Sequence, residues 1–364
     1  MSPNPAPPPE ATEAGPTGPG AKGWWIYQAP GAAAQRCERL SAQQPPWREF
    51  TGTQDPEYAP PGSSDPAWQE TRRRGSGYVP DTEEKDAVNT ALYLRRPLLV
   101  TGKPGVGKST LAYSVAADLE LGPVLHWPIT SRSTLRDGLY QYDAIGRLHD
   151  ANLAHLHAAT PTAAPVSRSI APYLRLGPLG TALLPQERPR VLLIDEIDKS
   201  DIDLPGDLLT VFEEGSFEIP ELARIAGQEP AVRIGTHDDP EPQVWVERGR
   251  VQCRSFPVVV LTSNGERDFP PPFLRRCIRL HMEPPGKERL AQIVRQRLGL
   301  DASADDRYRD LVEAFIERRL DGDLATDQLL NAVQLRLGGA WPDPQEREQF
   351  LESVLQRLTS TPSA

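Results

Sequence analysis

The sequence predicts an α/β fold in which helices flank a parallel sheet, preceded by a proline-rich arm and followed by a helical domain. Three observations support this prediction. A glycine-rich loop at 102–109 separates an apolar run typical of a buried strand, 98–101, from a segment with apolar residues at helical spacing, 110–119. A second apolar run, 191–194, ends in two acidic residues. The last 80 or so residues have a helical composition. We expect an arm, an α/β domain and a helical domain at 1–76, 77–283 and 284–364.

Length, charge and cysteine content exclude several classes of protein. The chain has 364 residues, enough for more than one domain, and a net charge of −10. Because sequence-independent nucleic-acid binding needs clustered Lys and Arg, this charge argues against a general polyanion binder. The three cysteines form neither a disulfide framework nor a zinc spacing. The sequence shows no secretory leader and no run of about 18 apolar residues, so we expect a cytoplasmic protein without a membrane span.

The arm combines a low-complexity start with an aromatic segment. Residues 1–23 are rich in Pro, Ala and Gly, and such a composition cannot bury enough apolar area to offset the entropy of ordering, so we expect the arm to be largely disordered. The segment Trp24-Trp25-Ile26-Tyr27 has two interpretations. It can lie across the folded body as a belt, because burial of aromatic side chains is favourable. Alternatively, it can dock a partner protein.

A regular pattern begins near residue 78. Thr82 is a candidate N-cap, with Glu83 and Glu84 in the first turn of a helix that we expect to reach about Leu94 and to stop before Pro97.

The loop that follows the next strand fits the phosphate-binding pattern G-x-x-x-x-G-K-[ST] at every fixed position. Its glycines let backbone N–H groups turn inward around an anion, and the following helix presents the positive end of its dipole to the same phosphates. We expect Lys108 to reach the β- and γ-phosphates and Ser109 to ligate Mg²⁺. The residues expected to hold the nucleotide are Gly102, Lys103, Pro104, Gly105, Val106, Gly107, Lys108, Ser109 and Thr110.

Further along, the pattern predicts a second strand at 124–129, helical segments to about 159, a loop at 160–165 and an approach to the third strand at 173–179. The third strand, 191–194, ends in Asp195 and Glu196. A buried strand holds such carboxylates rigidly beside the phosphate loop. We expect Asp195 to hold Mg²⁺ and Glu196 to act as the general base on water.

Two more candidates follow a strand at 258–263. Asn264 can orient the attacking water or contact the γ-phosphate. A proline-rich turn then leads into a short helix that carries Arg275 and Arg276. A guanidinium donated by a neighbouring subunit would stabilise charge on the γ-phosphate.

These motifs resemble the AAA+ ATPases, and the MoxR branch most closely, over about residues 78–358. Besides the phosphate loop and the acidic pair, the stretches that look like this family are Gly177-Pro178-Leu179, Asp195-Glu196-Ile197-Asp198-Lys199, Leu208-Leu209 and Glu213-Glu214. The resemblance implies a P-loop ATPase that uses ATP and Mg²⁺, with Asn264 as sensor 1 and Arg276 as the arginine finger. Arg275 is the alternative finger. MoxR-like proteins also insert a hairpin before the sensor-1 strand, and 244–247 with 251–253 alternates suitably.

The C-terminal domain resembles the helical lid of the family, with helices expected at 287–298, 306–320, 326–337 and 345–358. Many relatives carry a sensor-2 arginine at the start of the third lid helix. This chain has none at 324–330.

The resemblance implies a ring, with a hexamer expected, that remodels a partner protein, for which a von Willebrand A-type protein is a candidate. The aromatic segment and the hairpin around Trp245 are the surfaces expected to meet that client. Three alternatives remain: a slow nucleotide-dependent switch, an interaction protein with a decayed site, and a DNA-acting motor. A decayed site is disfavoured because the motif residues Lys108, Ser109, Asp195, Glu196 and Asn264 are all present. A DNA-acting motor is disfavoured because no basic domain accompanies the body.

Overall fold

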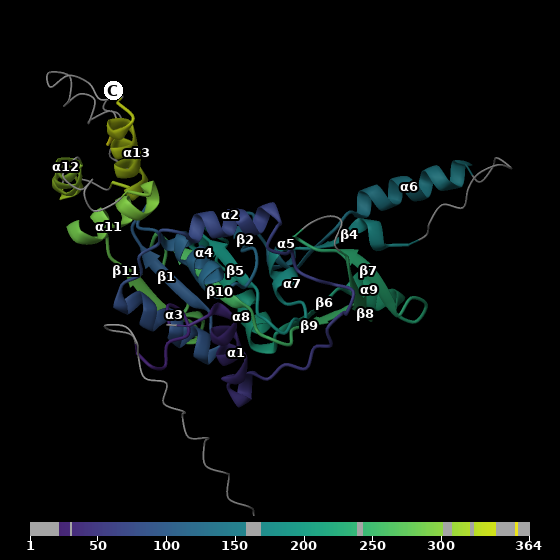
Figure 1. Ribbon diagram of the computed structural model, residues 1–364. Coiled ribbons are helices and arrows are strands. Elements are labelled where there is room, and N and C mark those ends of the chain that lie inside the picture. Colours follow the sequence, from purple (N-terminus) through teal and green to yellow (C-terminus); the bar gives the residue numbers. More distant parts are fainter. Residues whose placement is uncertain are drawn as a thin grey trace, which may run out of the picture.

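The computed structural model describes residues 22–29, 31–157, 169–238, 243–300, 308–320, 324–339 and 354–355. Within them, a five-stranded sheet has the order β11-β1-β10-β5-β2, and every pairing in it is parallel. Its strands are β11 (Ile278–Met282), β1 (Leu98–Gly102), β10 (Val258–Ser263), β5 (Val191–Asp195) and β2 (Leu125–Pro128). This arrangement confirms the predicted parallel α/β fold (Figure 1).

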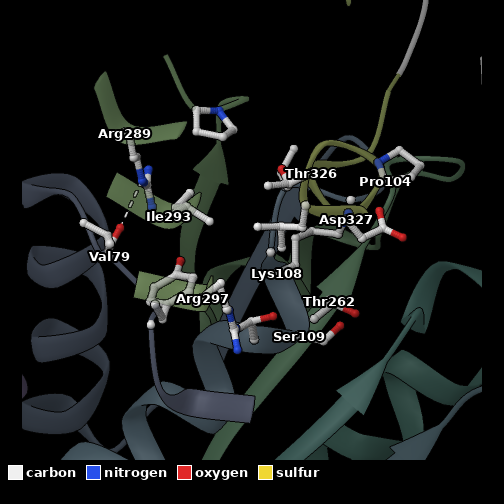
Figure 2. A pocket seen from close by; sticks show the side chains of 18 of the residues that line it. Val79, Pro104, Lys108, Ser109, Thr262, Arg289, Ile293, Arg297, Thr326 and Asp327 are labelled. Atoms are coloured by element: carbon white, nitrogen blue, oxygen red, sulfur yellow. Dashed lines mark hydrogen bonds between the residues drawn. The ribbon is translucent and has the colours of Figure 1, made fainter. Parts of the chain in front are cut away.

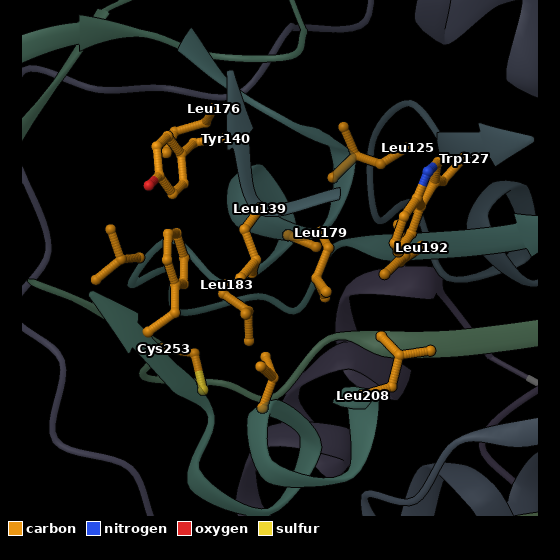
Figure 3. Close-up of a cluster of buried hydrophobic side chains, with 14 of the residues drawn as sticks. Leu125, Trp127, Leu139, Tyr140, Leu176, Leu179, Leu183, Leu192, Leu208 and Cys253 are labelled. Atoms are coloured by element: carbon orange, nitrogen blue, oxygen red, sulfur yellow. The ribbon is translucent and has the colours of Figure 1, made fainter. Parts of the chain in front are cut away.

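Both faces of this sheet are covered, which explains why its strands read as continuous apolar runs. On one face, Val191 and Leu193 pack with residues of α3 (Thr82–Leu94) and α4 (Lys108–Asp118). On the other face, Leu192 and Ile194 pack with residues of α7 (Pro178–Ala182) and α8 (Leu204–Glu214). Figure 3 shows Leu192 of this second layer beside Leu179, Leu183 and Leu208. The core therefore fixes β5, and with it the acidic pair, from both sides.

The predicted N-cap of α3 is wrong by one residue. Asp81, not Thr82, caps the helix: its side chain accepts from the Glu84 N–H at 2.8 Å, and the Glu84 carboxylate accepts from the Asp81 N–H at 3.2 Å. This reciprocal capping box satisfies the N–H groups of Asp81 and Glu84. The helix ends at Leu94, as predicted.

The predicted hairpin belongs to a second sheet, with the order β3-β4-β7-β8-β9-β6. Its strands are β3 (Tyr140–Tyr142), β4 (Leu174–Leu176), β7 (Ala231–Gly235), β8 (Gln243–Glu247), β9 (Arg250–Gln252) and β6 (Ser216–Glu218). The turn between β8 and β9 has positive φ at Arg248 and Gly249, as a two-residue hairpin turn requires. The short helices α5 (Leu135–Leu139) and α9 (Pro220–Ile225) accompany this sheet. From its edge α6 (Ala144–His157) extends away from the body (Figure 1), while the loop predicted at 160–165 lies outside the described residues.

Three lid helices are described: α11 (Lys287–Leu298), α12 (Arg309–Leu320) and α13 (Thr326–Leu337). The first and third have the predicted bounds. The start predicted for the second, and nearly all of the helix predicted at 345–358, lie outside the described residues. The three helices share their own buried cluster, which includes Leu290, Phe315 and Leu329.

The prediction of a largely disordered arm is wrong for residues 22–29 and 31–76. This part contains α1 (Ala33–Ala42) and α2 (Pro66–Gly75), and it lies against the body. Ile26 and Tyr27 are fully buried, Asn89 on α3 accepts from both of their N–H groups, and the Tyr27 hydroxyl lies 2.7 Å from Ser114 Oγ on α4. The belt interpretation of the aromatic segment is therefore confirmed. Residues 1–21 lie outside the described residues.

None of the helices in the described part of the chain combines the length and the apolar character needed to cross a bilayer.

Candidate functional site

The phosphate loop connects β1 to α4 and forms one wall of a cleft of about 530 Å³. Seven of the nine predicted nucleotide-binding residues line this cleft, from Pro104 to Thr110. Gly102 and Lys103 do not line it, and they contribute instead through their carbonyl groups. Gly105 has a φ of +75°, and a side chain there would collide with Ala325 of the lid, so the loop and the lid approach each other closely at this glycine.

Lys108 occupies the centre of the site. Its Nζ donates to Gly102 O at 2.7 Å, to Lys103 O at 2.9 Å and to Asn264 Oδ1 at 2.8 Å. Burial lowers the pKa of the Lys108 ammonium, while the carboxylates of Asp198, Asp195 and Glu196 act in the opposite direction. The structure thus brings the predicted lysine and the predicted sensor-1 amide into direct contact.

Asp195 and Ser109 lie together, as the sequence predicts for a magnesium site. Asp195 Oδ1 accepts from Ser109 Oγ at 2.8 Å and from Thr262 Oγ1 at 2.5 Å, and its Oδ2 lies 3.3 Å from His126 Nε2. Burial acts to raise the pKa of Asp195, but the hydrogen bonds from His126, Thr262 and Ser109 outweigh it and lower the pKa below its ordinary value. The carboxylate is therefore ionised at neutral pH.

Ser109 Oγ and Asp195 Oδ1 are hard oxygens of the type that Mg²⁺ prefers. They lie 2.8 Å apart, joined by a hydrogen bond, so the two groups are close enough to serve one ion.

Glu196 lines the cleft next to Asp195 and has a backbone φ of +60°, which is uncommon for a residue with a side chain. Thr262 Oγ1 accepts from the Glu196 N–H at 2.9 Å and so holds this conformation. The Glu196 carboxylate is half exposed and accepts from Lys199 Nζ at 2.7 Å. It is thus accessible from the cleft, as a general base must be.

Asn264 depends on a second carboxylate of the same segment. Asp198 Oδ2 accepts from the Asn264 N–H at 2.8 Å and from the Glu266 N–H at 3.2 Å, which fixes the turn after β10. Asp198 is nearly fully buried. It therefore sets where the Asn264 amide points.

The opposite wall of the cleft comes from the lid and from the segment between α2 and α3. Gly77, Tyr78 and Val79 line it, as do residues of α11 and α13. Figure 2 shows Arg289, Ile293 and Arg297 of α11 along one side of the cleft, facing Lys108, Ser109 and Thr262. The lid residues at this wall are Arg289, Ile293, Arg297, Thr326, Asp327 and Leu330.

The two lid arginines that line the cleft, Arg289 and Arg297, both form hydrogen bonds with other parts of the chain. Arg289 Nη2 donates to both carboxylate oxygens of Glu84 at 2.7 Å, and Arg297 donates to the carbonyls of Arg73 and Arg74 at the end of α2. At the start of α13 the cleft is lined by Thr326 and Asp327. No arginine stands at this position, where many relatives carry the sensor-2 arginine.

Arg276 is the one predicted catalytic residue that does not line the cleft. It lies on α10 (Pro271–Arg276), its side chain is 42% exposed, and its Nε donates to Glu213 Oε1 at 2.7 Å. Arg276 is therefore exposed at the surface, outside the cleft of its own chain.

Sequence reasoning missed several residues of the site. Thr262 and His126 contact Asp195, and Tyr78, Arg289 and Arg297 line the cleft. Thr262 had a usable signal, because it is a polar residue near the end of an otherwise apolar strand. Arg289 and Arg297 had none, since the residues that they contact come from distant segments of the chain.

Residues 97–277 match the family model described as AAA domain (dynein-related subfamily). Among solved structures, the chain is similar to domain III of the replication initiation protein DnaA from Thermotoga maritima, with 16% sequence identity over 77% of this chain and 95% of that chain and a TM-score of 0.38. A search of curated proteins finds no match. The family match over residues 97–277, the parallel sheet, and the phosphate loop beside the carboxylate of Asp195 show that this part of the chain has the AAA+ P-loop fold.

Proposed function

We propose that the protein binds and hydrolyses ATP with Mg²⁺ as an oligomeric ring and uses the reaction to remodel a partner protein, in the manner of MoxR-like ATPases. The observation that supports hydrolysis is the convergence of Lys108, Ser109, Asp195, Glu196 and Asn264 on one cleft. Retention of all five side chains disfavours a decayed site.

The residues have separable roles in this proposal. Lys108 exchanges its carbonyl acceptors for the β- and γ-phosphate oxygens, and Asn264 orients the attacking water. Ser109 and Asp195 would hold Mg²⁺, which would supply positive charge against the negative charge that develops on the phosphates. Glu196 leaves Lys199 and accepts a proton from the attacking water.

Two substitutions test hydrolysis. Lys108→Ala should abolish nucleotide binding, whereas Glu196→Gln should retain binding and stop turnover, because it changes only the proton acceptor. Titration with a fluorescent ATP analogue and a phosphate-release assay measure the two properties. Equal ATP affinity in the wild type and Lys108→Ala would contradict the assignment.

Arg276 is proposed to complete the site of the neighbouring subunit. Loss of such an arginine costs about 10³-fold or more in related phosphoryl-transfer sites. Activity should rise with protein concentration as rings assemble, and mixtures of Arg276→Ala with Glu196→Gln subunits should recover activity at some contacts. Mixed rings that form without any recovery would refute action in trans.

The client is proposed to be a protein, and the hairpin around Trp245 is proposed as a surface that meets it. Trp245 is 44% exposed, whereas Trp25, Ile26 and Tyr27 are buried against the body and are not available. A pull-down from the native host with Glu196→Gln, set against Lys108→Ala, tests this role. A protein that is enriched only by Glu196→Gln supports remodelling of a client. Recovery of DNA would instead support a DNA-acting motor. Recovery of the ring alone would support a nucleotide-dependent switch.

A further inference from the structure

Arg48, in the part of the chain that precedes the matched AAA domain, joins the ends of two helices of the body. It lies in the turn Pro46–Arg48 and is nearly fully buried. Its Nε and Nη2 donate to Arg95 O at 3.2 and 2.7 Å, and its Nη1 donates to Phe212 O at 2.8 Å and to Glu213 O at 3.4 Å. Arg95 is the C-cap of α3, and Phe212 and Glu213 belong to the last turn of α8.

These carbonyls are the ones that a helix leaves without an internal partner at its C-terminal end, where a positive charge is stabilising. Neither α3 nor α8 has a basic residue in its own last turn. The arm therefore supplies a cation that both helices lack. The guanidinium also lies over the Phe256 ring, 4.6 Å from its centroid, which fixes its plane.

The side chain of Glu213 lies between Arg48 and Arg276, the candidate arginine finger. Its Oε1 accepts from Arg276 Nε at 2.7 Å, and its Oε2 lies 3.9 Å from Arg48 Nη1. A second tie reaches α10 from the end of α3, because Arg96 donates to Arg275 O at 3.2 Å. Helix α10, which carries Arg276, is thus held through Glu213 and through Arg96. Arg48 in turn binds the backbone at the ends of α8 and α3, from which these two side chains extend.

The contacts of Arg276 leave its outer edge available. Nε, on the inner edge, is bound to Glu213, and Nη1 has a long contact of 3.4 Å to Pro272 O. Among the described residues, no hydrogen bond engages Nη2 of Arg276. An exposed pair such as Glu213–Arg276 contributes little stability. It can nevertheless orient a guanidinium, provided that the backbone carrying Glu213 is itself fixed.

We propose that Arg48 and Glu213 are positioning residues for Arg276, so that the N-terminal arm is a working part of the site completed in the neighbouring subunit. This inference rests on the proposed trans role of Arg276. Arg48 anchors the end of α8, Glu213 holds the inner edge of the finger, and the outer edge is presented across the interface. A displacement of about 1 Å at a reacting group can cost about 10²-fold in rate.

The test compares Arg48→Met, Glu213→Ala and Arg276→Ala in the full chain, with Arg39→Met as the matched control. Arg39 is another arm arginine, and its Nη2 donates to Gly23 O within the arm at 3.0 Å. We expect Arg48→Met and Glu213→Ala to lower kcat by about tenfold to 10²-fold with KM and ATP affinity unchanged. Arg39→Met should match the wild type, and Arg48→Met combined with Arg276→Ala should be no slower than Arg276→Ala alone.

Mixed rings separate positioning from a folding defect. Arg48→Met subunits retain their own catalytic residues, so mixing them with Glu196→Gln subunits, which donate an intact finger, should restore activity. Mixing them with Arg276→Ala subunits should not, because neither donates a working finger.

If Arg48→Met fails to fold, the half-exposed Glu213→Ala carries the same comparison. Wild-type kcat in folded Arg48→Met or in Glu213→Ala, or a loss without recovery beside Glu196→Gln, would overturn the inference and leave the ATPase proposal intact. Wild-type kcat in Arg276→Ala would instead remove the trans role on which the inference rests.

Discussion

Substitution of Arg289 by Met tests how the lid is joined to the nucleotide cleft. Arg289 on α11 contacts both oxygens of Glu84 at 2.7 Å, Asp81 Oδ2 at 2.9 Å and Val79 O at 3.0 Å. Glu84 is 2% exposed. Removing the arginine leaves a buried carboxylate without its counter-charge, which typically costs about 3–5 kcal/mol of the free energy of unfolding.

The loss should depend on pH. Burial raises the pKa of Glu84 above its ordinary value of 4.5, and Arg289 is the main influence that opposes this rise. Without Arg289 the folded-state pKa rises further above the unfolded value, so the folded variant binds a proton more readily. Stability linked to that proton is present below the unfolded pKa and is lost as the pH rises through the folded pKa. Arg289→Met should therefore be destabilised less at pH 5.5 than at pH 8.

Urea unfolding at both pH values, followed by tryptophan fluorescence, measures this difference. Glu84→Gln in the Arg289→Met background should restore much of the stability, because no charge remains unpaired. Lys287→Met is the matched control, since it breaks an exposed pair with Glu313 at the start of the same helix and should cost under about 1 kcal/mol. An equal loss at pH 5.5 and pH 8, or no rescue by Glu84→Gln, would refute the reasoning.

Three further predictions concern the arm, the loop and the metal site. Tyr27→Ala should cost about 3–5 kcal/mol and Tyr27→Phe about 1 kcal/mol in urea unfolding, because only the former empties a fully buried site; equal losses would contradict this. Gly105→Ala should sharply weaken nucleotide binding, because the new Cβ would lie 2.3 Å from Ala325 Cβ, whereas Gly227→Ala meets nothing within 4 Å and should bind normally. Thr262→Val removes a hydrogen bond to Asp195 and should raise the Mg²⁺ concentration for half-maximal activity about tenfold or more; an unchanged Mg²⁺ dependence would exclude this role.

The parallel sheet and the phosphate loop could be predicted because their signals are local. A buried strand, a glycine-rich turn and a helix follow one another in the chain, so spacing alone fixes which atoms face the anion. Ser109 and Asp195 come from different elements, yet both positions are set by the same rule, that ligands gather at the carboxyl ends of parallel strands. In the structure the two side chains do meet, at 2.8 Å.

The order of the arm could not be predicted from its own residues. Aromatic side chains gain from burial against any apolar groove, whether it belongs to the same chain or to a partner. The position of the arm is set by Asn89, whose side-chain oxygen accepts from the N–H groups of Ile26 and Tyr27. Ser114 also contributes, because its hydroxyl hydrogen-bonds to the Tyr27 hydroxyl. These residues lie more than 60 positions away. No pattern within the arm indicates that they form one groove.

The second sheet shows the same limit at a larger scale. Alternating residues in β8 and β9 predict a hairpin correctly, because a two-stranded unit is a local feature. They do not reveal that β7 pairs with β8 over five residues, from Ala231 opposite Glu247 to Gly235 opposite Gln243. The buried face of β8 could pack against several kinds of element. Its pairing with β7 therefore depends on residues elsewhere in the chain and cannot be read from β8 alone.

The lid illustrates how a missing residue constrains mechanism. At the start of α13, where an arginine would meet the γ-phosphate, the cleft is lined by Thr326 and Asp327, and a carboxylate there cannot attract phosphate. The two α11 arginines that line the cleft, Arg289 and Arg297, are held by Glu84 and by the carbonyls at the end of α2, so either would have to give up existing contacts to reach a phosphate. Ile293 and Leu330 add apolar surface to the same wall. We therefore expect the lid to act mainly by enclosing the base and the sugar. Contact with the γ-phosphate would then fall to the phosphate loop and, under the proposed trans role, to Arg276 of a neighbouring subunit.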